Sequence, residues 1–122
     1  MLIEVSVGEV LDKLSILSIK LNKITDTDKL RNVAREMSAI SKHVPSEMLE
    51  DPLYQKLCGV NMRLWELEDE IRVCEKHGDF HNNFIRIARA VYLRNDERAA
   101  IKKEINIKYN SDLIEEKSYQ EY

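Results

Sequence analysis

The chain of 122 residues is long enough to bury one hydrophobic core and too short for two, and its 34% of charged residues, 3 glycines and 2 prolines favour helices over strands joined by many turns. A formal net charge of -3 excludes an overall basic surface of the kind that binds nucleic acid or an anionic membrane. We therefore expect one all-α domain over residues 1–122, with no nucleic acid and no membrane among its partners.

The two cysteines indicate the compartment. Cys58 and Cys74 fall in one predicted helix, where the rise per residue separates them by about 24 Å, which is beyond the reach of a disulfide. Free thiols suit a reducing cytosol, and no stretch has the apolar length of a signal peptide core or a membrane span. We expect a cytoplasmic protein.

The first predicted helix begins at Ser6, which with Glu9 matches a capping box. Before it, residues 2–6 alternate apolar and polar side chains, a pattern typical of a short strand. Within the helix, apolar residues recur at steps of three and four and so share one stripe. This stripe consists of Val7, Val10, Leu14, Leu17, Leu21 and Ile24.

A second helix follows after the polar residues 25–28, whose side chains can cap it, and the short link predicts an antiparallel hairpin. It ends at Pro45, because proline cannot continue a helical hydrogen-bond ladder, and residues 46–51 are expected to form a connector. The stripe of this helix is Leu30, Val33, Met37, Ile40 and Val44.

The third predicted helix is the longest. Asp51 before Pro52 is a strong start signal, and Gly78 is suited to a left-handed C-cap, which gives a helix of about 39 Å. Its stripe has no gap and consists of Leu53, Leu57, Val60, Leu64, Leu67, Ile71 and Cys74.

The fourth helix is expected to begin after Asp79, and its apolar pattern is interrupted where Arg94 and Arg98 occupy stripe positions. Either Asn95 or Asp96 caps a new helix, or the arginines point inward at carboxylates; we favour the break because Asn-Asp is a strong cap signal. Residues 113–119 alternate weakly and could pair with residues 2–6. The expected fold is an antiparallel bundle of four to five helices, with a small two-stranded ribbon between the termini as an optional addition.

Two helices carry a second stripe opposite the first. Ile16 and Ile19 lie on the face of the first helix that is expected to be exposed to solvent, and Trp65 lies on the corresponding face of the third helix. We favour contact with another helix of the chain; a self-complementary dimer face and a ligand groove with Trp65 as a stacking platform are the alternatives. The expected partner is a second copy of the chain.

Two pairs of carboxylates have the E-x-x-D spacing of helical Mg²⁺ sites in nucleotide pyrophosphate hydrolysis. These pairs are Glu9 with Asp12 and Glu66 with Asp69. All four residues lie away from the apolar stripes, so they are not expected to converge in the core, and solvated faces explain them better.

A cysteine and two histidines have a spacing close to that of zinc ligands, at Cys74, His77 and His81. A zinc site needs a fourth ligand, and Gly78 interrupts the helix between these donors. We favour a buried cysteine beside two surface histidines, and we expect neither a metal nor another cofactor.

Arg94, Arg98 and Lys102 recur every fourth residue and form a basic ridge that could hold phosphate. We favour the alternative, in which the ridge faces the acidic residues 66–75 of the preceding helix. The chain has no G-x-S-x-G elbow and no glycine-rich phosphate loop. No catalytic residue is predicted, and whether the chain is an enzyme stays open.

Several short motifs resemble those of a family of short uncharacterised helical proteins found in bacteria and phages, classed as a domain of unknown function. The motifs span most of the chain: Val5–Lys13, Ile16–Lys20, Val60-Asn61, Leu64-Trp65, Glu68-Asp69, Asn95–Arg98, Ile101-Lys102, Glu104–Asn106 and Glu115–Tyr119. The resemblance implies a link to surface polysaccharide synthesis and supplies no established activity.

The polar positions within and beside these motifs form the candidate ligand-binding set. They are Glu9, Asp12, Lys13, Asn61, Trp65, Asn95, Asp96, Arg98, Lys102 and Lys117. We hypothesise that they meet in one cluster, with Asp12 paired with Arg98 or Lys102, as a buried network or an anion site.

The function we expect is that of a small, non-catalytic interaction or adaptor protein that associates with itself. The alternative is a binder or metal-dependent hydrolase of a phosphorylated small molecule, such as a nucleotide or nucleotide sugar.

Overall fold

The computed structural model describes residues 1–122 and contains five helices and no strand. The helices are α1 (Val7–Lys23), α2 (Thr27–Ser41), α3 (Ser46–Leu49), α4 (Pro52–His77) and α5 (Asn82–Lys108). The expectation of an all-α protein is confirmed. None of the helices combines the length and the apolar run that crossing a membrane requires.

Local signals set the helix boundaries. The Ser6 hydroxyl accepts a hydrogen bond from the backbone N–H of Glu9 at 3.1 Å, and this contact begins α1. Asp51 caps α4 by accepting from the N–H of Leu53 at 2.8 Å. Gly78 ends α4 with a φ of 63°, a left-handed conformation that residues with a side chain rarely adopt. These predicted boundaries are confirmed.

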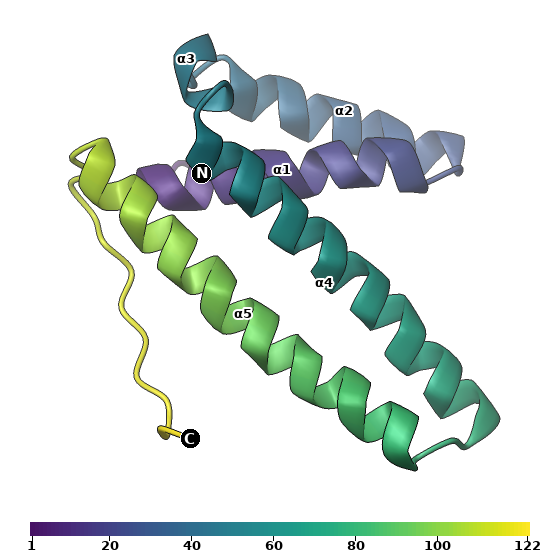
Figure 1. The fold of residues 1–122 in the computed structure, drawn as a ribbon. Helices are drawn as coiled ribbons and strands as arrows, with labels where there is room; N and C mark the ends of the chain where they lie inside the picture. Colours follow the sequence, from purple (N-terminus) through teal and green to yellow (C-terminus); the bar gives the residue numbers. More distant parts are fainter.

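The long helices form two hairpins that cross (Figure 1). The helix α2 returns beside α1, and α5 returns beside α4. The helix α1 lies against both α4 and α5, whereas α2 packs chiefly against α1. Contact from two sides therefore covers the second stripe of α1 within the chain, and Ile19 is only 5% exposed.

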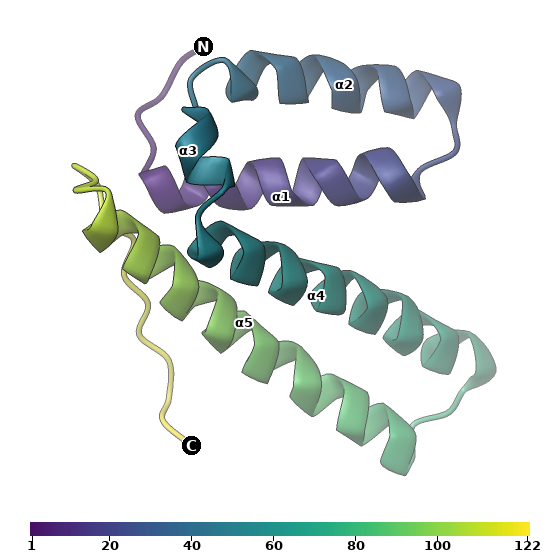
Figure 2. The same cartoon turned by 45° about the horizontal axis from the view of Figure 1, so that its top comes forward.

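The apolar side chains form two separate cores. The first lies where α1 crosses the start of α4 and the end of α5, and it contains Leu11, Tyr54, Leu57, Ile101 and Ile105. The second lies between α4 and α5 alone and contains Leu67, Cys74 and Ile87. The helices α4 and α5 are joined by a turn, and Figure 2 shows that the part of the hairpin near this turn extends well past α1 and α2. We call this part of the hairpin, residues 63–94, the hairpin arm.

The expected break at Asn95 is wrong, because α5 continues without interruption to Lys108. The Asn95 side chain donates to the carbonyl of Val91 at 3.1 Å and caps nothing. The alternative holds for Arg98, which reaches a carboxylate of α1. The start of α5 is also later than expected, at Asn82, and the connector contains the short α3.

The expected ribbon is absent, since neither residues 2–6 nor residues 113–119 form a strand. The C-terminal segment instead lies along α5, held by ion pairs from Lys102 to Glu115 and from Lys103 to Glu116, each 3.1 Å long. Side-chain pairing to a helix thus replaces the backbone pairing that a weak alternation suggested.

Candidate functional site

A buried ion pair joins α1 to α5. The carboxylate of Asp12, which is 1% exposed, accepts two hydrogen bonds from the guanidinium of Arg98, one of them from Nε to Oδ1 at 2.9 Å. This two-pronged contact fixes the orientation of both groups. It is the pairing that the sequence suggested, between residues separated by most of the chain.

The helix α4 contributes an amide to the same carboxylate. Asn61 Nδ2 donates to Asp12 Oδ1 at 2.8 Å and lies 2.6 Å from Ser15 Oγ. The Ser15 hydroxyl in turn donates to the backbone carbonyl of Asp12 at 2.7 Å. The carboxylate of α1 is therefore held by side chains of α4 and α5, and these hydrogen bonds offset the cost of its burial.

A second cation lies beside this pair. Lys102, which is 7% exposed, has its Nζ 2.8 Å from Glu9 Oε2, 3.1 Å from Glu115 Oε2 and 4.0 Å from Asp12 Oδ2. The cluster thus contains three carboxylates around two cations. Glu9 and Glu115 neutralise Lys102 from α1 and from the C-terminal segment.

The protonation of these groups follows from their contacts. Burial disfavours the charged form of Asp12, but the hydrogen bonds from Arg98 and Asn61 outweigh it and hold the pKa of the carboxyl below its usual value. The hydrogen bond to Asp12 raises the pKa of Arg98. Burial also works against the charged form of Lys102, yet its bonds to Glu9 and Glu115 raise its pKa. Asp12, Arg98 and Lys102 are therefore charged near neutral pH.

The N-terminus of α1 touches α5 directly. The backbone N–H of Gly8 donates to Asn106 Oδ1 at 2.7 Å, and that of Val7 donates to Ser111 Oγ at 3.1 Å. A Cβ at position 8 would lie 2.6 Å from the carbonyl oxygen of Lys102, so only glycine allows this approach. Side chains beyond α1 thereby satisfy two of the free N–H groups of its first turn.

The structure brings half of the candidate set together. Those that meet are Glu9, Asp12, Asn61, Arg98 and Lys102. The sequence-based set lacked Gly8, Ser15, Asn106 and Glu115. All four lie in or beside the motifs that resemble the family, and that position is the signal that could have identified them.

Two further candidates, Trp65 and Asn95, line a groove next to the cluster. The groove has a volume of about 590 Å³ and is also lined by Asn61 and Arg98. Its apolar part comes from Ile16 and Leu64. The groove therefore lies where α1 diverges from the hairpin arm, with the polar cluster at one end.

The other candidates lie elsewhere. Lys13 pairs with Glu36 of α2 at 3.0 Å, and Lys117 lies 3.5 Å from Glu115. Asp96 accepts a hydrogen bond from the hydroxyl of Tyr122, on the face of α5 that the C-terminal segment covers.

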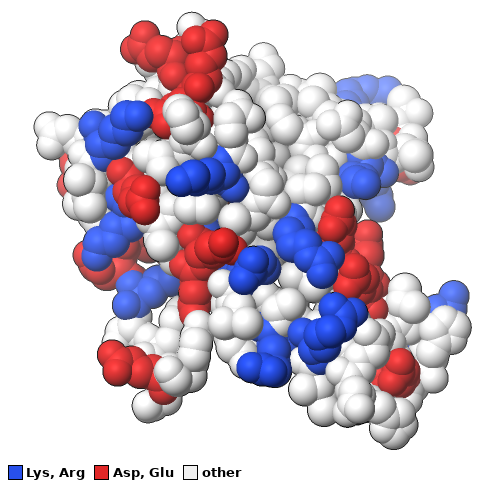
Figure 3. Space-filling view, in the orientation of Figure 1, with Lys and Arg blue, Asp and Glu red and all other residues white.

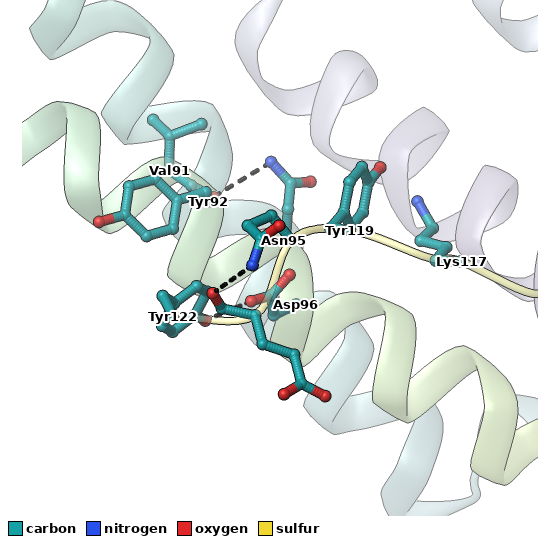
Figure 4. Close-up of a pocket in the computed structure, with 9 residues that line it drawn as sticks. Val91, Tyr92, Asn95, Asp96, Lys117, Tyr119 and Tyr122 are labelled. Carbon is teal, nitrogen blue, oxygen red and sulfur yellow. Dashed lines mark hydrogen bonds between the residues drawn. The ribbon is translucent and has the colours of Figure 1, made fainter.

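A second cavity, of about 970 Å³, separates that segment from α5. Figure 4 shows Lys117, Tyr119 and Tyr122 on the segment beside Tyr92 and the neighbouring residues of α5. The rings of Tyr92 and Tyr122 meet edge to face with their centroids 5.6 Å apart. Asn95 lines both this cavity and the groove beside Trp65. Asp96 and Lys117 line this cavity and not the groove.

The basic ridge forms no ion pair with the acidic residues 66–75 of α4, so the favoured pairing is wrong, although Arg98 lines the groove together with Glu68 and Asp69. Arg94 pairs with Glu97 on its own helix at 3.2 Å, and Arg98 and Lys102 bind the carboxylates described above. Partners one turn away are already within reach on a helix, and they compete with a neighbouring helix. Figure 3 accordingly shows basic and acidic side chains interspersed over one face of the molecule.

The residues of the predicted metal-ligand patterns have other partners. Asp12 is buried and binds Arg98, and Glu9 binds Lys102 beside it, so the expectation of a solvated face is wrong for Asp12. Cys74 is buried in the second core. The structure brings together no group of three histidine, cysteine, aspartate or glutamate side chains in metal-binding geometry.

A smaller polar contact lies at the last residues of α5. Asp51, which is 6% exposed, lies 2.6 Å from Lys108 Nζ and accepts from the hydroxyl of Tyr109. Hydrogen bonds from Lys108, Tyr109 and the N–H of Leu53 lower the pKa of Asp51 to about 2. This carboxylate therefore joins the start of α4 to the end of α5.

We expect the contact of Asp51 to weaken in acid. A carboxyl whose folded pKa lies below its unfolded value stabilises the fold above the unfolded pKa, here 3.8, and loses that contribution as the pH falls toward about 2. Asp51→Asn, which can still cap α4, should therefore have a lower melting temperature than the unsubstituted chain at pH 6, and the difference should shrink between pH 4 and pH 2. A constant difference across that range would contradict the assignment.

Comparison with known proteins identifies the family. The model described as "Family of unknown function (DUF6165)" matches residues 1–122. Neither a curated protein nor a solved structure matches the chain. Because the match covers the whole chain, the resemblance seen in the motifs is confirmed at the level of the family, and the protein belongs to this family of unknown function.

Proposed function

We propose that the protein is a small, non-catalytic interaction protein that associates with itself and acts as an adaptor. The observation that carries the proposal is the hairpin arm, whose core is covered by two helices only. Large apolar side chains of the arm are exposed to solvent: Val73 by 54%, Phe80 by 51%, Ile85 by 52% and Tyr92 by 45%. Apolar side chains grouped on one projecting element are typical of a protein contact.

The polar cluster supports the same proposal because both of its cations are already paired with carboxylates. Arg98 is bound to Asp12, and Lys102 is bound to Glu9 and Glu115, so an anionic ligand would have to displace carboxylates that are already in place. We assign the cluster the role of setting the angle between α1 and the hairpin arm, which fixes the direction in which the arm projects.

Sedimentation velocity tests the proposal. We expect the weight-average sedimentation coefficient to rise with protein concentration toward the value of a dimer, because an exposed apolar surface gains from association. A chain that stays monomeric over the whole accessible concentration range would remove self-association from the proposal.

The groove beside Trp65 favours a second candidate function, the binding of a phosphorylated small molecule. An indole ring there could stack on a base or sugar. The charged residues that line the same groove are Arg72, Arg98, Glu68 and Asp69. A rise in melting temperature with a nucleotide, nucleotide sugar or sugar phosphate that Trp65→Ala removes would favour binding over self-association. Dependence of that rise on Mg²⁺ would point to the hydrolase form of the same candidate.

The proposal includes the cytoplasm of a bacterial or phage-infected cell as the location and surface polysaccharide synthesis as the context. The free thiols of Cys58 and Cys74, the second of them buried, support a reducing compartment.

A further inference from the structure

The two helices of the hairpin arm carry opposite charge. On α4, residues 66–75 include five acidic side chains and one arginine. On α5, the stretch from Asn82 to Asn95 has three arginines, Arg86, Arg89 and Arg94, and no acidic residue. Such an arrangement would suit ion pairs between the two helices.

Within the hairpin arm, no ion pair joins α4 to α5. Glu66 and Glu70 both bind Arg63 of their own helix, each at 3.2 Å. Arg86 donates to the side-chain oxygen of Asn83 at 2.8 Å and has no carboxylate partner. Two carboxylates of α4 thus share one arginine, and Arg86 of α5 has no carboxylate partner. The opposite charges of the two helices therefore do not pair with each other within the chain.

One face of the arm brings Glu70 of α4 and Arg86 of α5 to the same small cavity. A cavity of about 320 Å³ there has three apolar lining residues, Val73, Cys74 and Ile87. Its polar lining consists of Arg63, Glu70 and His77 from α4, Asp79 from the turn, and Asn83 and Arg86 from α5. Glu70 lies seven residues before the end of α4 and Arg86 four residues after the start of α5. At about 1.5 Å per residue, the two therefore lie within about 5 Å of each other along the hairpin. Val73 in this face is 54% exposed.

We propose that this face of the hairpin arm binds a second copy of the chain, with a two-fold axis running along the hairpin. The inference rests on the proposed self-association and names its interface. Rotation about such an axis stacks α4 of one copy on α5 of the other. Glu70 of each copy then meets Arg86 of the other at the same level, and the two Val73 side chains are buried between them. The two hairpins complete a four-helix bundle around the second core.

Charge reversal tests the interface by complementation. In a homodimer of Glu70→Arg, the new arginine of each copy meets Arg86 of the other, so like charges face each other at both contacts. In a homodimer of Arg86→Glu, the new glutamate of each copy meets Glu70 of the other, again with like charges at both contacts. We expect each variant alone to dimerise on the order of tenfold more weakly or worse than the unsubstituted chain. In an equimolar mixture every contact between the two variants pairs opposite charges, so a heterodimer should form again. Sedimentation velocity, with one variant carrying a fluorescent label, measures both results.

The matched controls change the same charges away from the arm. Arg35→Glu on α2 and Glu104→Arg near the end of α5 are exposed and should leave the dimer unchanged. Circular dichroism of each variant establishes that it is folded. Dimers that the two arm variants leave intact, or that mixing does not restore, would overturn this interface and leave self-association standing. A monomeric unsubstituted chain would overturn both.

Discussion

Replacing Arg98 with alanine is expected to lower the free energy of unfolding by about 3 kcal/mol, because it leaves the buried carboxylate of Asp12 without its charged partner. Asn61 remains bound to that carboxylate, and Lys102 is 4.0 Å away, which places the loss toward the lower end of what breaking a buried pair costs. For a domain of this size the melting temperature should fall by about 10 °C. Urea unfolding followed by circular dichroism measures the change.

The control for this substitution lies one turn earlier on the same helix. Arg94→Ala removes a half-exposed pair with Glu97, and we expect it to cost less than about 0.5 kcal/mol. The double variant Asp12→Ala, Arg98→Ala should lose less free energy of unfolding than the two single variants lose together, because neither charge of the pair is then left without its partner. An Arg98→Ala chain of unchanged stability would argue against a structural network and would favour the anion site of the second candidate function.

The boundaries of the helices were predictable because their signals are local. Ser6, Asp51 and Gly78 each act on backbone groups within four residues, and their contacts in the structure are the ones that the sequence suggests. The apolar stripes were predictable for the same reason, since the period of a helix is a local property.

The break at Asn95 was predicted wrongly because the deciding contact is not local. Arg98 occupies a stripe position in α5, and sequence reasoning left open whether a carboxylate would meet it there. Asp12 is separated from Arg98 by 86 residues, so nothing near Asn95 in the sequence reveals that the charge is compensated. Given that partner, an uninterrupted α5 satisfies more backbone hydrogen bonds than two helices with a break.

The sequence could predict part of the polar cluster, namely Asp12 and Asn61, but not the contact between Gly8 and Asn106 beside it. Asp12 and Asn61 were noted because they are polar residues on helix faces that packing alone does not explain, and such residues tend to meet. The approach of Gly8 to Asn106 depends on how closely two helices pass each other, a distance that no spacing in the sequence records. The way in which the two hairpins cross likewise cannot be read from residue spacing.

The close passage of α1 over α5 leaves no room for a side chain at Gly8. A methyl group at this position would lie 2.6 Å from the carbonyl oxygen of Lys102 and 3.0 Å from Asn106 Oδ1. The carbonyl belongs to the backbone of a helix and cannot rotate away, so α1 must shift. The shift would lengthen the hydrogen bond from the N–H of Gly8 to Asn106 and disturb the contact of Lys102 with Glu9.

Gly8→Ala is therefore expected to destabilise the fold by about 2 kcal/mol or more, although alanine favours a helix over glycine by about 1 kcal/mol. The same substitution at Gly59, an exposed position within α4 where a Cβ would meet nothing within 4 Å, should instead stabilise the fold by about 0.5 to 1 kcal/mol. Opposite signs in the two unfolding curves would establish that close packing, and not helix propensity, decides the outcome at position 8. Stabilisation by both substitutions would mean that α1 and α5 do not pass as closely as the structure shows.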